Sequence, residues 1–215
     1  MKYKKKNCIL LIATGLLMMA TACNNAKDNK ATPTAKKDSG KKEVIKKEER
    51  ITLKKAPIIN ITDTLSIKRF VLCMKDSAAN SERVAIKLAA IYGIKLQTII
   101  KKNKLKVTGA PMAWYKKQKA PFFFEAGLPV DKIPAKLPAG VSVKKIGNDS
   151  VVVAHFYGPY DLTVQAYTAL QDWVKDRRKK IIQAPYEIYV DDPMEKNGKL
   201  KDPYKVQTDI VFTWR

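Results

Sequence analysis

The sequence is poor in cysteine and histidine, with three Cys and one His in 215 residues. Cys8 and Cys23 lie near the N-terminus, so Cys73 has no disulfide partner in the rest of the chain and reads as a small buried hydrophobe. Cys73 and His155 together give no metal-ligand spacing. The chain also lacks a G-x-S-x-G elbow, a Walker-type phosphate loop and a dinucleotide fingerprint. We therefore predict no disulfide framework, no metal and no cofactor.

Acidic residues are scarce, since 20 Asp and Glu stand against 42 Lys and Arg. The net charge of +22 divides into +8 for residues 1–50 and +14 for residues 51–215. A basic surface attracts phosphate polyanions without reading a sequence. An export signal argues against an encounter with nucleic acid, so we expect no nucleic-acid partner. Lipid headgroups or an anionic envelope polymer fit the charge better.

A long membrane-spanning run is also missing. The apolar stretch at residues 9–20 follows a Lys-rich start and is too short to cross a bilayer comfortably. It ends in Ala20-Thr21-Ala22-Cys23, which resembles a bacterial lipobox with Ala20 where Leu is usual. We predict a lipoprotein signal peptide at 1–23 with a lipidated Cys23, and a flexible Lys-rich tether at 24–50. The protein would be exported and lipid-anchored to a cell-envelope membrane, facing the periplasm; an ordinary cleaved signal or an uncleaved anchor is the alternative.

Residues 151–190 read as strand, turn, helix and strand. The apolar spacing after Asp161, a candidate N-cap, predicts an amphipathic helix. In the strand 186–190, a helix-facing Tyr186 and Ile188 would send Glu187 to the opposite face. A carboxylate among aromatics is typical of a site for a cationic or hydrogen-bonding ligand. The alternative is a solvated Glu on an exposed sheet face.

The same order of elements occurs twice. A predicted strand at 66–74 and a helix at 81–100 precede Ala110-Pro111, and Ala184-Pro185 follows the second helix. Both Ala-Pro pairs start a strand with a tyrosine at the same offset, Tyr115 or Tyr189; the closing strands are 121–125 and 206–214. We predict an α+β fold in 51–215: a tandem pseudo-twofold repeat of strand-helix-strand-strand modules, at about 64–130 and 141–215, with antiparallel sheets, two helices and a ligand cleft between the repeats. Ala113 takes the place of Glu187 in the first repeat.

Four segments resemble a known family. They are FFFEAGLPVD at 122–131, HFYGPYD at 155–161, PYEIYVDDP at 185–193 and the closing TDIVFTW. Together they are similar to the GyrI-like small-molecule-binding domain, also called the bacterial transcription activator effector-binding domain. The resemblance implies that aromatics stack a hydrophobic, often cationic, ligand against an acid, here Glu187. The aromatic residues expected around it are Tyr189, Tyr115, Trp114, Phe124 and Tyr157, followed by Phe122 and Tyr160.

The function that this predicts is a membrane-anchored protein that holds a hydrophobic small molecule, without the DNA-binding helix-turn-helix of many family members. The first alternative is a hydrolase of strained electrophiles, with Glu187 as general base and Tyr189 or Tyr115 as hydroxyl donor. The second is an envelope scaffold that binds anionic partners through its basic surface. The third is haem binding through His155, because the SOUL haem-binding proteins resemble this fold.

Overall fold

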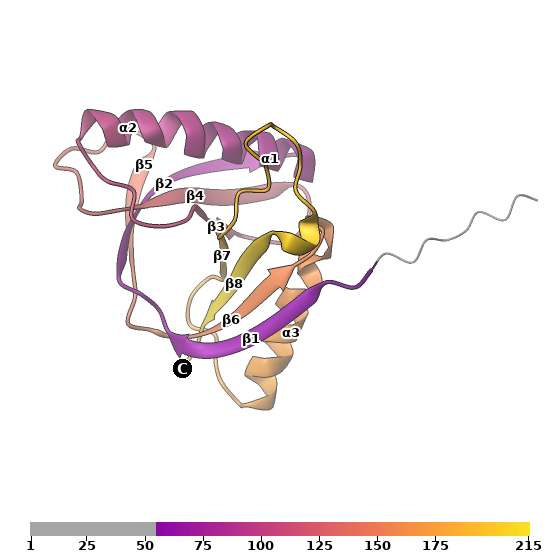
Figure 1. Ribbon diagram of the computed structural model, residues 1–215. Coiled ribbons are helices and arrows are strands. Elements are labelled where there is room, and N and C mark those ends of the chain that lie inside the picture. Colours follow the sequence, from indigo (N-terminus) through magenta and orange to yellow (C-terminus); the bar gives the residue numbers. More distant parts are fainter. Residues whose placement is uncertain (1–54) are drawn as a thin grey trace, which may run out of the picture. The chain divides into compact units, whose positions relative to one another are not determined.

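Eight antiparallel strands form one continuous sheet in the order β1-β6-β8-β7-β3-β4-β2-β5 (Figure 1). The strands are β1 (Ile58–Leu65), β2 (Arg69–Ala78), β3 (Met112–Tyr115), β4 (Phe122–Val130), β5 (Val141–Ile146), β6 (Ser150–Tyr157), β7 (Tyr186–Tyr189) and β8 (Gln207–Thr213). The computed structural model describes residues 55–215. The predicted signal peptide, lipidated Cys23 and tether lie outside the described residues.

The strand order has a twofold symmetry. Reading the sheet from one edge meets the strands of one repeat in the same order in which reading from the other edge meets the equivalent strands of the other repeat. The first repeat supplies β2, β3 and β4, and the second supplies β6, β7 and β8. They join edge to edge where β3 pairs with β7, and Ala113 lies opposite Glu187 at the centre. The predicted α+β fold with a tandem repeat is confirmed. The two separate small sheets that we expected are one sheet, because β3 and β7 pair with each other.

Two strands were not predicted from the sequence. β1 pairs with β6, and β5 pairs with β2, so each strand that precedes a repeat lies against the other repeat. In β1 every residue except Ile59 is exposed, so no alternation of apolar and polar residues marks it as a strand. These exchanged strands tie the two repeats together at both ends of the sheet.

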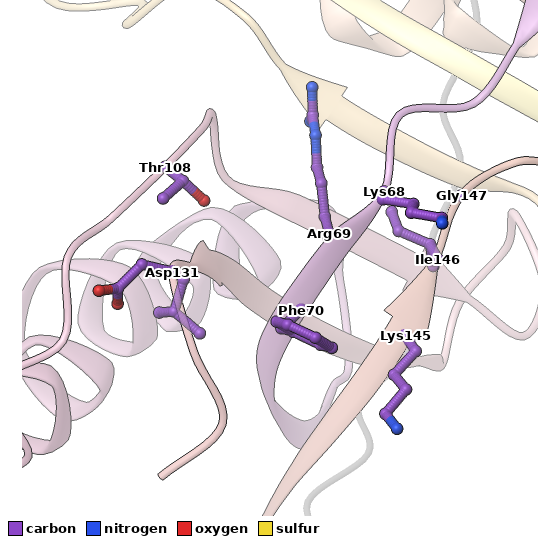
Figure 2. Close-up of a pocket in the computed structure, with 9 residues that line it drawn as sticks. Lys68, Arg69, Phe70, Thr108, Asp131, Lys145, Ile146 and Gly147 are labelled. Atoms are coloured by element: carbon purple, nitrogen blue, oxygen red, sulfur yellow. The ribbon is translucent and has the colours of Figure 1, made fainter.

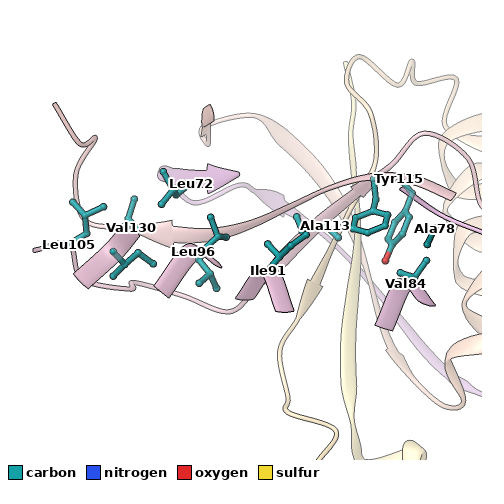
Figure 3. Packing of buried hydrophobic residues seen from close by; sticks show 13 residues of the cluster. Leu72, Ala78, Val84, Ile91, Leu96, Leu105, Ala113, Tyr115 and Val130 are labelled. Atoms are coloured by element: carbon teal, nitrogen blue, oxygen red, sulfur yellow. The ribbon is translucent and has the colours of Figure 1, made fainter. Parts of the chain in front are cut away.

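A helical segment with three parts covers the first repeat. α1 (Ser81–Ala90) continues into a π-helical turn, η1 (Ile91–Lys95), and then into α2 (Leu96–Lys102). The Asn80 side chain caps α1 by accepting the Arg83 backbone N–H at 2.9 Å. The predicted helix at 81–100 is thus present, and Gly93 lies in the π turn. Figure 3 shows the buried side chains of this segment against those of the strands, among them Val84, Ile91, Leu96, Leu72 and Val130.

The second helix, α3 (Thr163–Asp176), covers the second repeat (Figure 1). It follows a 3₁₀ turn, η2 (Tyr160–Leu162), so Asp161 belongs to this turn and α3 begins after it. Ala166, Tyr167, Leu170 and Val174 pack against the second repeat's strands. Among residues 55–215, no helix combines the length and apolarity that crossing a membrane requires.

Both helices lie on the same face of the sheet. Ala126, Ala113, Glu187, Ile210 and Ala154 form one row of paired residues across five strands. The first two residues of this row pack with the α1 and α2 cluster, and the last two with the α3 cluster. The row therefore runs from beneath one helix to beneath the other, with Glu187 between them.

The opposite face of the sheet has its own core, which corrects one prediction. Trp114, Tyr186 and Cys73 belong to this cluster, and Ile188 packs against it. Burial raises the pKa of the Cys73 thiol to about 12. Because Tyr186 and Ile188 point to this face, Glu187 and Tyr189 point toward the helices. We expected Tyr186 and Ile188 to face the helix and Glu187 to point away from it, and the structure shows the reverse.

Candidate functional site: a buried carboxylate caged by tyrosines

Glu187 lies at the centre of the sheet, with small residues on its β3 side. Its strand, β7, lies between β3 and β8, and the residues opposite it are Ala113 and Ile210. Ala113, Ala126 and Glu187 itself are all 0% exposed. Two alanines beside a longer side chain leave room above the sheet, and aromatic side chains fill that room.

Three tyrosines donate hydrogen bonds to the Glu187 carboxylate. The Tyr167 hydroxyl on α3 donates to Oε1 at 2.9 Å. The Tyr160 hydroxyl in η2 donates to Oε2 at 2.6 Å, and the Tyr189 hydroxyl on β7 donates to the same oxygen at 2.9 Å. We call Tyr160, Tyr167 and Tyr189 the tyrosine cage. The cage satisfies three of the roughly four hydrogen bonds that a carboxylate accepts.

The electrostatics of Glu187 are unusual because its partners are neutral. Among the described residues, no Lys, Arg or His forms an ion pair with it. Removal from water raises the pKa of the Glu187 carboxyl, and the hydrogen bonds from the tyrosine cage oppose that rise. The carboxylate in turn raises the pKa of each cage phenol, after desolvation as the larger cause. An ionised Glu187 would therefore have no counter-ion among the described residues.

A second layer of aromatics supports the cage. The hydroxyl oxygens of Tyr115 and Tyr189 lie 2.9 Å apart, and because Tyr189 donates to Glu187, Tyr115 donates to Tyr189. Tyr92, in the π turn, donates to the Met112 carbonyl at 2.8 Å, and its ring centroid lies 6.3 Å from that of Tyr189. This layer fixes the cage from the side of the first repeat.

Tyr160 differs from the other cage members in its exposure. It is 44% exposed, yet its hydroxyl turns inward to Glu187 and lies 3.4 Å from the Tyr115 hydroxyl. It sits in a short turn that the Thr163 hydroxyl braces by donating to the Tyr160 carbonyl at 2.8 Å. Tyr167 is only 6% exposed. Tyr160 is thus the cage member that separates Glu187 from solvent.

The structure brings some of the residues predicted from the sequence together and separates others. Tyr189, Tyr115 and Tyr160 lie at Glu187, and Phe124 lies one layer out, with its ring centroid 5.9 Å from that of Tyr115. Three predicted residues lie away from the carboxylate: Phe122 near the start of β4, and Trp114 and Tyr157 on the opposite side of the sheet. The alternation of side chains along β3 and β6 explains the last two positions.

Two residues of this site were not predicted from the sequence. Tyr167 lies in the buried stripe of α3 with Ala166 and Leu170, and Tyr92 lies on the apolar side of the first helix. A buried tyrosine hydroxyl needs a hydrogen-bond partner. A tyrosine in an otherwise aliphatic stripe was therefore the signal that a polar group lies beneath the helix.

His155 belongs to a separate network. Its Nδ1 lies 2.7 Å from Asp209 Oδ1, and its Nε2 lies 3.0 Å from the Thr62 hydroxyl. Both ring nitrogens thus have protein partners, and a haem iron would have to displace one of them. Within residues 55–215, no three His, Cys, Asp or Glu side chains come close enough together to hold a metal ion.

No protein-family model matches the sequence, and no curated protein matches it either. Among solved structures, the C-terminal domain of EcmrR has a TM-score of 0.59 at 21% identity, covering 74% of this chain and 98% of that domain. EcmrR in its complex with DNA has a TM-score of 0.58 at 23% identity over 79% of this chain, which spans only 60% of that EcmrR chain. An uncharacterized conserved protein from Listeria innocua has a TM-score of 0.50 at 14% identity, covering 75% of this chain and 93% of that protein. These likenesses establish the fold.

Proposed function

We propose that this chain, whose described residues have the fold of the GyrI-like effector-binding domains, binds a hydrophobic cationic small molecule against Glu187. The observation that carries the proposal is the fully buried carboxylate with three phenol donors. Among the described residues no cationic side chain pairs with it. A cation brought by a ligand would supply the missing charge.

The energetics favour a cation over a neutral ligand. Burying a charged group without a counter-ion costs roughly several kcal/mol of folding free energy, even when the group is hydrogen-bonded. The rings of Tyr92 and Tyr160 each adjoin the ring of Tyr189, and the faces of these rings offer cation–π contacts. Aromatic burial would supply affinity, and Glu187 would select the charge.

Access to the carboxylate requires a side chain to move. Because Glu187 is 0% exposed and Tyr160 is the exposed member of the cage, we propose that the ligand displaces Tyr160. The hydrogen bond from Tyr160 to Oε2 would be replaced by a contact with the cation. Tyr167 and Tyr189 stay in place, because α3 and β7 hold them.

A hydrolase is the second candidate, and the raised pKa of Glu187 favours it. A carboxyl with a pKa nearer neutrality is a better general base for water than an exposed one. Glu187 would take a proton from a water molecule that attacks a ring carbon of a strained electrophile, and Tyr189, supported by Tyr115, would donate a proton to the ring oxygen or nitrogen as its bond to that carbon breaks. Consumption of an epoxide or aziridine that stops in Glu187→Gln would select this candidate.

The binding proposal is tested by a thermal-shift screen of the purified protein against hydrophobic cations, neutral aromatics and anions. A cation that raises the melting temperature of the wild type should have much less effect on Glu187→Gln. Glu125→Gln is the matched control, since Glu125 carries the same charge on β4 and pairs with Lys144 at 3.0 Å. Equal stabilisation of both variants by the cation contradicts the proposal.

We also propose that Cys23 carries a lipid that anchors the chain to the cell envelope, facing the periplasm. The support is the sequence pattern at residues 1–23, with the lipid-linked cysteine expected as the first residue of the mature protein. Mass spectrometry of the mature N-terminus should find an acylated cysteine, and Cys23→Ser should release the protein from membranes. An unmodified Cys23 in the membrane fraction contradicts the anchor.

A further inference from the structure

A surface cavity of the described residues lies at the strand ends of the first repeat (Figure 2), and none of its lining residues belongs to the tyrosine cage. Its volume is about 570 Å³. It is lined by the start of β2, the ends of β4 and β5, and the loop that carries Thr108. We call it the strand-end cavity.

The charges of the strand-end cavity are mainly positive. Lys68, Arg69 and Lys145 line it, and Figure 2 shows them leaving the strands around Phe70 in different directions. None of the three forms an ion pair with a carboxylate in the described part of the chain. The cavity's one carboxylate, Asp131, already accepts the Lys106 backbone N–H at 2.8 Å. Lys145 lies opposite Phe70 in the register of β2 and β5, and Arg69 lies opposite Ile146, so Arg69 leaves the sheet on the other face from Lys145. Lys68 and Lys145 are therefore the cations that remain available to a ligand beside Phe70.

The repeat symmetry relates one residue of the cavity to a residue of the second repeat. Val130 of β4 corresponds to Trp214, because the bridge between Val107 and Val130 matches the bridge between Ile181 and Trp214. In the second repeat, the rings of Trp214 and Trp173 pack at 51° to each other with centroids 5.8 Å apart. The cavity is thus lined by a valine where the second repeat has a larger indole.

We propose that the strand-end cavity binds an organic phosphate, meaning a phosphate group joined to an apolar moiety. Phe70 gives the apolar part a surface, and Lys68 and Lys145 give the phosphate charge-assisted donors. Flexible lysine side chains close on an anion at little steric cost. A free aryl phosphate and a phospholipid headgroup share this chemistry.

Calorimetric titration of the purified protein with phenyl phosphate tests the site. We expect one binding site, weaker binding of inorganic phosphate, and loss of at least about tenfold in affinity in the Lys68→Gln/Lys145→Gln double variant, since hydrogen bonds to charged groups are strong. The control, Lys101→Gln/Lys102→Gln, removes the same charge from exposed positions on α2. Vesicles of phosphatidylglycerol, compared with phosphatidylcholine, show whether the source is a lipid headgroup.

A steric variant tests the cavity independently of charge. Val130→Trp copies Trp214 and should block phenyl phosphate; if that buried change prevents folding, Thr108→Trp fills the cavity from an exposed position. Glu187→Gln should leave phenyl phosphate binding unchanged, which separates this site from the tyrosine cage. The proposal is overturned if phenyl phosphate does not bind at millimolar concentrations, or if the control double variant weakens binding as much as the cavity variant.

Discussion

The two repeats share a register but not a central residue. Ala113 and Glu187 face each other across the junction of β3 and β7, and both are fully buried. Two residues further along each strand, Tyr115 and Tyr189 occupy equivalent positions and meet through their hydroxyls. Both repeats thus contribute a tyrosine at this position, but only the second repeat contributes a carboxylate. One charge in a neutral tyrosine cage suits a ligand with a single cationic centre.

The helices also differ between the repeats. The first repeat's helix contains a π turn that places Tyr92 against Tyr189, whereas α3 is regular and places Tyr167 directly on the carboxylate. π turns inside helices often occur at functional sites. The second repeat therefore makes the contacts to the charge, and the first repeat supports them.

Restoring the symmetry should have the largest effect. Ala113→Glu places a second carboxylate opposite Glu187 in the row, where both would be buried without a cation. We expect the free energy of unfolding to fall by about 3 kcal/mol or more at pH 8 relative to Ala113→Gln, which adds similar volume without charge. The raised pKa of such a pair means that the loss shrinks as pH falls and the carboxyls protonate. Equal stability of the two variants at pH 8 in denaturant unfolding contradicts the account.

Removing a donor from the second repeat should cost more than removing one from the first. Tyr167→Phe takes a hydrogen bond from the Glu187 carboxylate, and we expect a loss of about 1.5–3 kcal/mol in unfolding free energy. Tyr92→Phe takes a bond from the Met112 carbonyl and should cost about 0.5–1.5 kcal/mol. In the Glu187→Gln background, the cost of Tyr167→Phe should drop toward that of Tyr92→Phe. A cost that does not change with residue 187 would show that the two side chains are not coupled.

Neutralising the charge should stabilise the free protein at high pH. Burial raises the pKa of Glu187 above 4.5, so the folded state binds its proton more tightly than the unfolded state does. The wild type therefore loses stability as pH rises from about 4.5 through the folded pKa, by about 1.4 kcal/mol for each unit between the two pKa values. Melting temperatures of wild type and Glu187→Gln should diverge with rising pH in favour of the variant. A wild type that gains on the variant as pH rises contradicts the raised pKa.

The smallest effect concerns the π turn. A Cβ added to Gly93 meets no heavy atom within 4 Å, so Gly93→Ala should raise the free energy of unfolding by about 0.5–1 kcal/mol through the helix propensity of alanine. Thermal unfolding measures the gain. A loss of stability would show that the π turn depends on glycine itself.

Much of the fold was predictable because it depends on local patterns. The apolar stripes of the helices and the paired Ala-Pro starts of β3 and β7 indicated the repeat. The edge strand β1 was not predicted because its exposed residues show no alternation. β5 lies at the start of the predicted second repeat, but the strand-helix-strand-strand module has no strand ahead of β6. The prediction of which face Glu187 points to was wrong for a different reason. The sequence shows that a helix precedes β7 but not which face of the sheet that helix covers.

The site was predictable in its centre and not in its surroundings. Motif and strand parity placed Tyr189 on the same face as Glu187, and the repeat placed Tyr115 near them. Tyr167 comes from α3, and its place in an aliphatic stripe indicates a polar partner beneath the helix without identifying that partner as Glu187. Trp114 was predicted with Tyr115 from the motifs and the repeat, although adjacent residues of a strand point to opposite faces.

The most direct test compares phenyltrimethylammonium with tert-butylbenzene, which have the same shape and differ in charge. Their affinities for wild type and Glu187→Gln should be measured by calorimetry as pH is raised through the Glu187 pKa. We predict that the cation binds the wild type more tightly as Glu187 ionises, by up to about tenfold per pH unit below the pKa. The neutral compound should bind both proteins equally at every pH. Affinity for the cation that is independent of both pH and residue 187 would contradict the role of Glu187.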